Sequence, residues 1–155
     1  MSGLHSAVLV IATLTTGLSA GLFFAFSCSV MPGLRHSDDR SFVQVMQWIN
    51  RKILNPWFLG VYLGALILDV LAVVLRWGTA ELPWLLAGAV LYLVLVVITA
   101  AINVPLNNQL DAAGEPERPA EVRAAYEPRW VRWNLIRTVA VVASFAAMLA
   151  GLVAA

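Results

Sequence analysis

Charged residues and cysteines are both scarce in this chain of 155 residues. Only 12% of the residues are charged, 61% are hydrophobic and the mean hydropathy is +0.81, which is too apolar for the surface of a soluble domain of this length. The single cysteine, Cys28, excludes an intramolecular disulfide and any site built from several cysteines. The net charge of +1, without a basic patch that carries interleaved aromatics, argues against a nucleic-acid partner. The chain is therefore expected to lie in a lipid bilayer.

Four long apolar stretches dominate the sequence. A helix needs roughly 20 residues to cross a bilayer, and stretches of that length predict spans over about 5–29, 57–76, 83–102 and 134–154. The first stretch has no Lys or Arg before it and is longer than the apolar core of a secretion signal, so we expect it to be retained as a span. Together these stretches predict one four-helix membrane domain over residues 1–155.

Two of the connections contain helical patterns of their own. Residues 38–54 have acidic residues at the start and basic residues near the end, as the helix dipole favours, and this predicts an amphipathic helix that lies at the membrane surface or caps the bundle. A polar turn over 111–119 leads into a short helix over 120–133 before the fourth span. The expected fold class is all-α, a polytopic bundle of four transmembrane helices. The apolar face of the amphipathic helix consists of Phe42, Val45, Met46, Ile49 and Ile53.

The cations are distributed unevenly between the two ends of the expected bundle. Four lie in the first connection and five in or beside the third, whereas the opposite end has Arg76 alone. By the positive-inside rule, both long connections are cytoplasmic and both termini face outside. This distribution predicts a multi-pass protein of the cell membrane.

Small residues recur every four positions in three of the spans, which allows helix backbones to approach closely in lipid. This spacing indicates tight packing inside one bundle, and contact between copies in a homo-oligomer is the alternative. Pro32 after the first span and Pro105 after the third also hint at two related helix hairpins. The longest series of small residues is Thr13, Gly17, Gly21, Ala25 and Ser29.

Polar side chains gather where the third and fourth spans reach the cytoplasmic side. Asn103 and Asn107 share a face if the helix persists through the intervening proline, and Asn134 and Arg137 share a face of the fourth span. Amides and a guanidinium together suit a planar ligand that carries carbonyl or phenolate oxygens. Each also has an ordinary role as a cap, a turn residue or a headgroup contact. The further candidates to contact such a ligand are Trp57, Asn108, Trp130 and Trp133.

Ionisable residues within the spans are few. Asp69 lies well inside the second span, where an ionisable group by default suggests a function, and we expect it to join Tyr92 in a buried, hydrogen-bonded polar layer. The two histidines, His5 and His36, lie at opposite ends and cannot share a metal ion, so no metal site is predicted. His36 is the imidazole on the side of the expected pocket and is a candidate general base.

Several strings of residues together resemble a known family. They are Gly-Leu-Phe-Phe-Ala-Phe-Ser at 21–27, Ile-Asn-Arg at 49–51, Asn-Val-Pro-Leu-Asn-Asn at 103–108 and the Trp-Asn and Arg-Thr pairs within 133–138. In these strings, which are spread over almost the whole chain, the sequence resembles the anthrone-oxygenase-like family of small four-helix integral membrane proteins, catalogued as a domain of unknown function. Characterised fungal members oxidise anthrones to anthraquinones with molecular oxygen, without a metal or a flavin.

The resemblance implies an oxygenase that uses O₂ as co-substrate and no other cofactor, with a hydrophobic aromatic small molecule and the lipid bilayer as partners. Oxygen reacts without a cofactor only with an electron-rich substrate. The protein therefore has to favour an anthrone enolate, by a base near the ring methylene and by donors aimed at the developing oxyanion. For the base, His36 is the first choice, Asp69 the second and solvent water the third. The candidate donors are Arg137, Asn103, Asn107 and Asn134.

Three other classes of protein are compatible with these features. A membrane binder of a quinone-like or lipid ligand needs the same pocket without turnover and is the first alternative. A transporter is expected to have broken helices and charged residues near the midplane, for which only Asp69 is present. A structural partner in a larger membrane complex needs exposed stripes of small residues.

Overall fold

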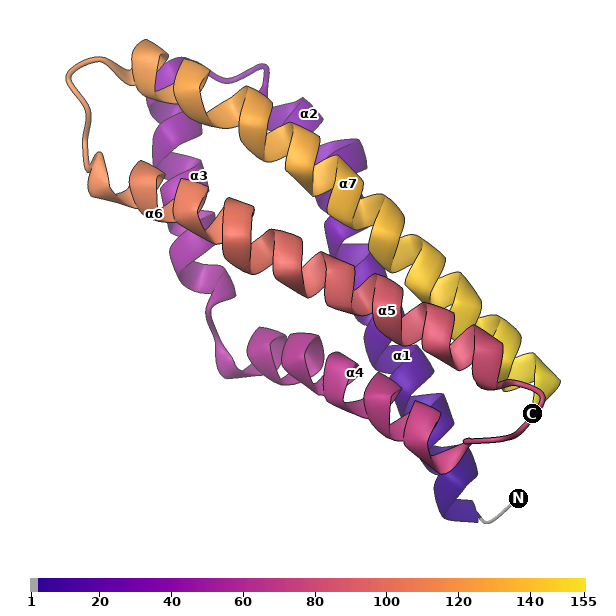
Figure 1. Cartoon of the computed structure of the whole chain (residues 1–155). Coiled ribbons are helices and arrows are strands. Elements are labelled where there is room, and N and C mark those ends of the chain that lie inside the picture. The colour runs from indigo at the N-terminus through magenta and orange to yellow at the C-terminus, as the bar shows by residue number, and fades with distance from the viewer. Residues whose placement is uncertain (1–2) are drawn as a thin grey trace.

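The computed structural model describes residues 3–155 and consists of four long helical rods and the shorter helix α3 (Asp39–Ile53), which connects the first two rods (Figure 1). The rods are Gly3–Leu34, Pro56–Leu75, Leu82–Ala112 and Pro119–Ala154. All four are long and apolar enough to cross a membrane, and no strand occurs in the described range, which confirms the all-α class with four membrane-spanning helices. The start of the first rod and the end of the last lie at one end of the bundle, opposite the two long connections (Figure 1). In chain order the elements are α1 (Gly3–Ala25), η1 (Phe26–Val30), α2 (Met31–Leu34), α3 (Asp39–Ile53), α4 (Pro56–Leu75), α5 (Leu82–Ile98), η2 (Thr99–Asn103), α6 (Val104–Ala112) and α7 (Pro119–Ala154).

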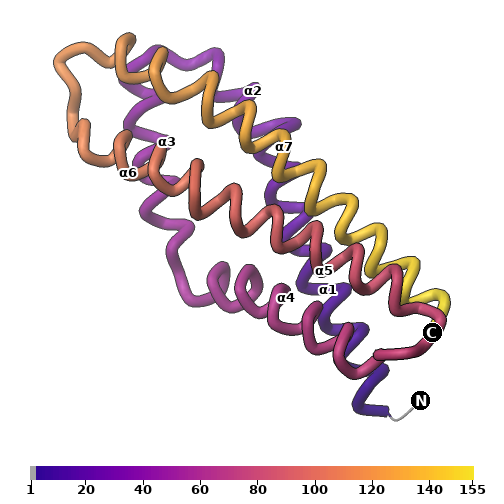
Figure 2. The backbone as a smooth tube through the Cα atoms, viewed as in Figure 1, coloured from indigo at the N-terminus to yellow at the C-terminus, as the bar shows by residue number. Residues whose placement is uncertain are grey.

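The first and third rods continue through their prolines by means of one wide π-helical turn each, η1 and η2. The N–H group just before each proline donates to a carbonyl five residues back, from Met31 to Phe26 and from Val104 to Thr99. A proline has no N–H and its ring crowds the preceding turn, and a turn widened by one residue accommodates it. The chain therefore passes without a break from α1 into α2 and from α5 into α6 (Figure 2).

The last rod, α7, is one continuous helix, which corrects the expectation of a separate short helix over 120–133. It begins at Pro119, because a proline is tolerated in the first turn, where its N–H would have no helical partner. Pro128 inside the helix removes a single backbone donor. Tyr126 and Trp130 on either side are buried in the core and hold both halves of α7 against the bundle. As a result, Arg137 lies in the middle of a helix instead of at its start.

The four rods pack as a ring in which α1 contacts α4 and α7, and α5 contacts α4 and α7. The closest approaches occur at glycines. A Cβ atom on Gly88 would lie 2.7 Å from the sulfur of Met148, and one on Gly17 would lie 2.8 Å from the ring of Phe145. Gly21, in the same small-residue series as Gly17, meets no atom within 4 Å. The predicted series is therefore used only in part for packing inside the chain.

A layer of buried polar groups crosses the middle of the bundle. Asp69 is fully buried, and the Thr16 hydroxyl donates to its carboxyl group, with 3.1 Å to each oxygen. Tyr92 is also fully buried; its hydroxyl donates to the carbonyl of Tyr62 at 2.9 Å and lies 2.8 Å from the Ser19 hydroxyl. These bonds tie α1, α4 and α5 together. At the end of α4, Arg76 pairs with Glu81 in the turn to α5 and leaves Asp69 to Thr16.

The amphipathic helix α3 caps the bundle at the end opposite the termini. Its Phe42, Val43 and Met46 are fully buried and belong to one apolar cluster with side chains of α2, α6 and α7. Val43 takes the place expected for Val45, which is exposed. At the start of the helix, Asp38 accepts a hydrogen bond from the Ser41 N–H at 3.0 Å, as an N-cap residue does, and hydrogen bonding from Ser41 lowers the pKa of Asp38.

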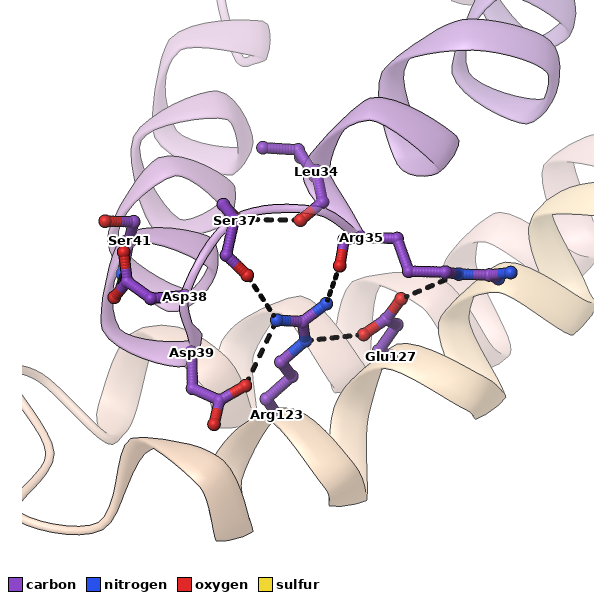
Figure 3. Close-up of polar contacts among 8 residues, drawn as sticks. All are labelled: Leu34, Arg35, Ser37, Asp38, Asp39, Ser41, Arg123 and Glu127. Atoms are coloured by element: carbon purple, nitrogen blue, oxygen red, sulfur yellow. Dashed lines mark hydrogen bonds and ion pairs between the residues drawn. The ribbon is translucent and has the colours of Figure 1, made fainter.

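Arg123 of α7 forms hydrogen bonds and ion pairs that hold α3 against α7 (Figure 3). Its guanidinium donates to the backbone carbonyls of Ser37 and Arg35, at 2.9 Å and 3.1 Å, in the turn that leads into α3. It also pairs with two carboxylates, Asp39 at 3.1 Å and Glu127 at 2.7 Å. All three nitrogens of the guanidinium are thus engaged, which joins the α2–α3 turn to α7.

Candidate functional site

A cavity of about 200 Å³ lies where α3 covers the ends of the rods. Its wall is mostly apolar and aromatic, with a small set of polar side chains, which is the usual make-up of a site for an organic ligand. The polar side chains come from α3, η2, α6 and α7. They are Asn50, Arg51, Thr99, Asn107, Asn108, Asp111 and Arg137.

Arg137 is the most buried charged group in the wall of this cavity, with 5% of its surface exposed. Its Nε and Nη2 atoms donate to Oδ1 of Asn134 at 3.1 Å and 3.0 Å, and Nη1 donates to the Thr99 hydroxyl at 3.3 Å. The guanidinium also lies 4.6 Å from the ring centre of Phe23 and 5.1 Å from that of Trp130. These contacts fix the plane of the guanidinium and its direction.

None of these partners carries a negative charge, and within residues 3–155 no carboxylate forms an ion pair with Arg137. Dipoles and π-faces offset only part of the cost of burying a cation. A buried cation in the wall of a cavity strongly favours an anion inside that cavity, since the attraction is weakly screened there. The cavity is therefore suited to a ligand with a negatively charged oxygen.

Asn107 contributes a second donor, and its neighbours fix which way its amide faces. Its side-chain oxygen accepts from Nε1 of Trp130 at 2.8 Å and from the Tyr126 hydroxyl at 2.9 Å. An indole N–H can only donate, so the atom that faces Trp130 has to be the oxygen of the amide. The amide nitrogen of Asn107 forms no hydrogen bond within the described part of the chain and lies in a residue that lines the cavity. Its two N–H groups are therefore available to a ligand.

The two wide turns shape this cavity. Phe26, the first residue of η1, and Thr99, the first residue of η2, both line it. A π-helical turn shifts the side chains that follow it around the helix axis, and such turns occur frequently at functional sites. η2 ends at Asn103, and the helix continues through Pro105 to Asn107, four residues further on. Asn107 lines the cavity, whereas Asn103 does not.

The two other predicted donors lie behind the wall. Asn134 does not line the cavity; its oxygen holds Arg137 and its nitrogen donates to Ser27 at 2.8 Å, so it acts as a support for the guanidinium. Asn103 is fully buried, and neither atom of its amide has a hydrogen-bond partner among residues 3–155. Of the predicted ligand contacts, Trp130 and Asn108 line the cavity.

The remaining predicted residues lie elsewhere. His36 is exposed in the turn between α2 and α3, and Asp69 is in the polar layer of the mid-bundle, so neither candidate base lines the cavity. Trp57 is 87% exposed and Trp133 half-buried, both outside the cavity. These positions suit tryptophans that anchor a helix end at the membrane interface. Across residues 3–155, no group of three or more His, Cys, Asp or Glu side chains is placed to hold a metal ion.

Several residues of the site were not assigned to it from the sequence. Phe23 and Phe26 face the cavity from the first rod, Thr99 bonds Arg137, and Asn50 lies on α3 with its amide nitrogen 3.5 Å from the Tyr126 hydroxyl. Phe23, Phe26 and Asn50 all lie in strings that carry the family resemblance. The signal was therefore present, but only the fold shows that these strings converge.

Comparison with known proteins agrees with the resemblance. The family model described as anthrone oxygenase matches residues 46–147, about two thirds of the chain. The matched segment contains every polar side chain that lines the cavity and begins after His36. No curated protein and no solved structure matches the chain. The match runs from α3 to α7, and on this evidence the chain belongs to the anthrone oxygenase family.

Proposed function

We propose that this membrane protein is an oxygenase that oxidises an anthrone, or a similar electron-rich polycyclic phenol, with O₂ in the cavity beneath α3. One observation carries the proposal: Arg137 is a buried cation in the cavity wall and has no carboxylate partner in residues 3–155. An enolate or phenolate oxygen supplies the missing negative charge.

The reaction has a simple balance. The ring methylene of the anthrone loses two hydrogens, one atom of O₂ becomes the new ketone oxygen, and the other leaves as water. Removal of the first proton leaves an electron pair that is shared between the ring carbon and the carbonyl oxygen. The carbanion then transfers electrons to O₂ directly, so the proposal needs O₂ as co-substrate and no further cofactor.

The chain's own residues favour the enolate over the neutral substrate. Arg137 and the amide of Asn107 donate to the oxygen on which charge develops, and donors held in place beforehand stabilise such charge most effectively. The aromatic rings of Phe23, Phe26 and Trp130 offer flat surfaces for a polycyclic substrate. A bilayer supplies both reactants, because oxygen and aromatic hydrocarbons partition into its core.

The protein is proposed to lie in the cell membrane with both termini outside and the cavity at the cytoplasmic end. Nine of the ten cations lie in the half of the molecule that contains α3 and the α6–α7 turn, and the positive-inside rule places that side in the cytoplasm. The bilayer and the aromatic substrate are the proposed partners. A homo-oligomer is compatible with the open glycines of α1 and α4, Gly21, Gly60 and Gly64.

The test is oxygen consumption by the purified protein in detergent or in vesicles, with anthrone as substrate and anthraquinone as the product quantified by chromatography. We expect protein-dependent oxygen uptake with equal amounts of product. Arg137→Ala removes the charge and Arg137→Lys keeps the charge but loses the planar fork, so both are expected to slow the reaction. Unchanged oxidation in both variants would rule out the role of Arg137.

A membrane binder of a quinone-like or lipid ligand is the second candidate. The observation that favours it is that Arg137 and Asn107 both line the cavity with donor groups, which can also donate to the carbonyl oxygens of a quinone. The two candidates differ in turnover. Saturable binding of anthraquinone without oxygen uptake on anthrone would favour the binder.

A further inference from the structure

Removal of the first proton from the substrate needs an acceptor, and neither histidine nor Asp69 lies at the cavity. Water alone is a weak acceptor, and a positioned side chain contributes about 10²–10⁴-fold to such a step. The acceptor has to lie within hydrogen-bond reach of the substrate. The proton acceptor is therefore expected among the side chains of the cavity wall.

Asp111 is the only carboxylate among the described residues that line the cavity, and none of those residues is a histidine. It lies in the last turn of α6, four residues after Asn107, so the two side chains occupy one face of that helix. The Asp111 side chain is 46% exposed, whereas Arg137 is 5% exposed. The acidic group therefore lies at the mouth of the cavity and the cation lies deep inside it.

The two oxygens of Asp111 differ in their surroundings. Oδ1 accepts from Nε of Arg51 on α3 at 2.6 Å, which holds the carboxylate across the mouth. Oδ2 has no hydrogen-bond partner among residues 3–155 and is free to take a proton. Because the group is half-exposed, that proton can pass on to water after each turnover.

We propose that Asp111 is the catalytic proton acceptor, and that Arg51 is the positioning residue that orients it. This inference rests on the function proposed above. In the step, a C–H bond of the ring methylene breaks and its proton bonds to the Asp111 carboxylate. The electron pair stays on the substrate, where the carbonyl oxygen becomes an oxyanion beside Arg137 and the Asn107 amide. The step needs no oxidant, because oxidation follows only when O₂ reacts with the enolate.

The chain contains a matched control for this carboxylate. Arg40 of α3 pairs with Glu115 in the α6–α7 turn at 2.5 Å, and both side chains are exposed. This pair also links α3 to the chain around the end of α6, but neither residue lines the cavity. Loss of Glu115 therefore reports the effect of breaking a surface ion pair here, without loss of a group in the site.

The test is hydrogen–deuterium exchange at the methylene of anthrone, in D₂O without oxygen, followed by mass spectrometry. We expect the protein to accelerate exchange over buffer, Glu115→Gln to leave the rate unchanged, and Asp111→Asn to lower the protein-dependent rate at least about tenfold. Asp111→Glu restores a carboxylate and is expected to recover part of the rate. Asp111→Ser gives a second variant without a carboxylate, and thermal unfolding of each variant shows that it is folded.

The outcomes separate the two proposals. If the unaltered protein accelerates exchange and both carboxylate-free variants match it, the role of Asp111 is overturned and the proposed function stands. Equal losses in the Asp111 and Glu115 variants would also overturn it, because they would show a structural effect of the ion pairs. No acceleration by the unaltered protein would overturn the proposed function, and the role of Asp111 with it.

Discussion

Arg123 and Arg137 lie on the same helix, about four turns apart, and each guanidinium stacks on a phenylalanine ring, at 4.4 Å for Phe42 and 4.6 Å for Phe23. Their partners differ. Arg123 is surrounded by two carboxylates and two backbone carbonyls (Figure 3), whereas Arg137 has one amide oxygen and one hydroxyl. The charge of Arg123 is thus compensated by carboxylates, whereas that of Arg137 is not.

The comparison shows that the partners of an arginine indicate its role. Arg123 is partly buried near the surface, with 12% of its side chain exposed; its charge is compensated within the chain and its contacts join two segments. Arg137 has rigid support but no counter-charge in residues 3–155, and it lines a cavity. We therefore assign Arg123 to the stability of the α3 cap and Arg137 to the ligand.

The largest effect is expected from Arg137→Gln. It removes the charge from the cavity and shortens the side chain, so that the donors aimed at the oxyanion are lost, and anthrone oxidation should fall about 10²–10³-fold. The temperature of thermal unfolding should not fall, because the substitution also removes an uncompensated buried charge. The measurement is the initial rate of oxygen uptake beside an unfolding curve of the same sample. A fall in unfolding temperature with an unchanged rate would reverse the assignment.

Arg123→Ala should have the opposite profile. It leaves two carbonyls and two carboxylates without their common donor, which is expected to lower the free energy of unfolding by about 2 kcal/mol. The oxidation rate per folded molecule should change much less than in the Arg137 variant. The measurement is unfolding in detergent, with Arg118→Ala as the control, since Arg118 is an exposed arginine of the same region that pairs with the exposed Glu121. Equal stability of the two variants would contradict the role of Arg123.

Asn107→Asp makes the surroundings of Arg137 more like those of Arg123. The substituted side chain keeps an oxygen that can accept from Trp130 and Tyr126, but it adds a negative charge to the cavity and removes the amide donor. We expect about a tenfold lower affinity for an anionic ligand, which is a cost of about 1.4 kcal/mol. The measurement is a binding titration with a hydroxyanthraquinone. Gln109→Glu, at an exposed position of α6 outside the cavity, is the control, and an equal effect there would point to general repulsion.

The smallest effect is expected at Asp38, whose carboxylate caps α3 next to the Arg123 contacts. The pKa of Asp38 is lower in the folded protein than in the unfolded chain. The ionised cap therefore stabilises the fold at pH values above the usual pKa of a carboxyl group, and this stabilisation is lost as the pH falls through the folded pKa. Asp38→Asn keeps a capping group that does not titrate, so unfolding of this variant should depend less on pH below about 4. Identical pH dependence of the two proteins would show that the ionisation of Asp38 contributes nothing to stability.

The class of fold follows directly from composition, because four apolar stretches of spanning length leave no soluble alternative. The boundaries of the helices were predicted less accurately. The sequence predicted the end of the first span near Ser29 and a break before Asn134, but the wide turns at η1 and η2 and the burial of Tyr126 and Trp130 carry the helices past their prolines. Such effects depend on packing between distant segments, which local patterns do not contain.

Only part of the site was predicted, because it also depends on packing between distant segments. Arg137, Asn107, Asn108 and Trp130 do line one cavity, since their helices end at the same side of the bundle. Asn103 and Asn134 lie behind the wall, and Asp111 was assigned only to a polar turn. Helical periodicity places a residue on a face of its own helix, but which faces meet is decided by the π-turns and by the way α3 packs on α6 and α7.

The central claim is that Arg137 holds an anionic oxygen in the cavity, and a colour change tests it directly. The phenolate of 2-hydroxyanthraquinone absorbs at longer wavelength than the neutral phenol, so its ionisation can be followed by titration with and without the protein. A cation in contact should lower the pKa of the bound phenol by about 1–3 units, and Arg137→Gln should abolish that shift while Arg123→Ala keeps it. Tight binding with an unshifted pKa, or the same shift in the Arg137→Gln variant, would contradict the claim.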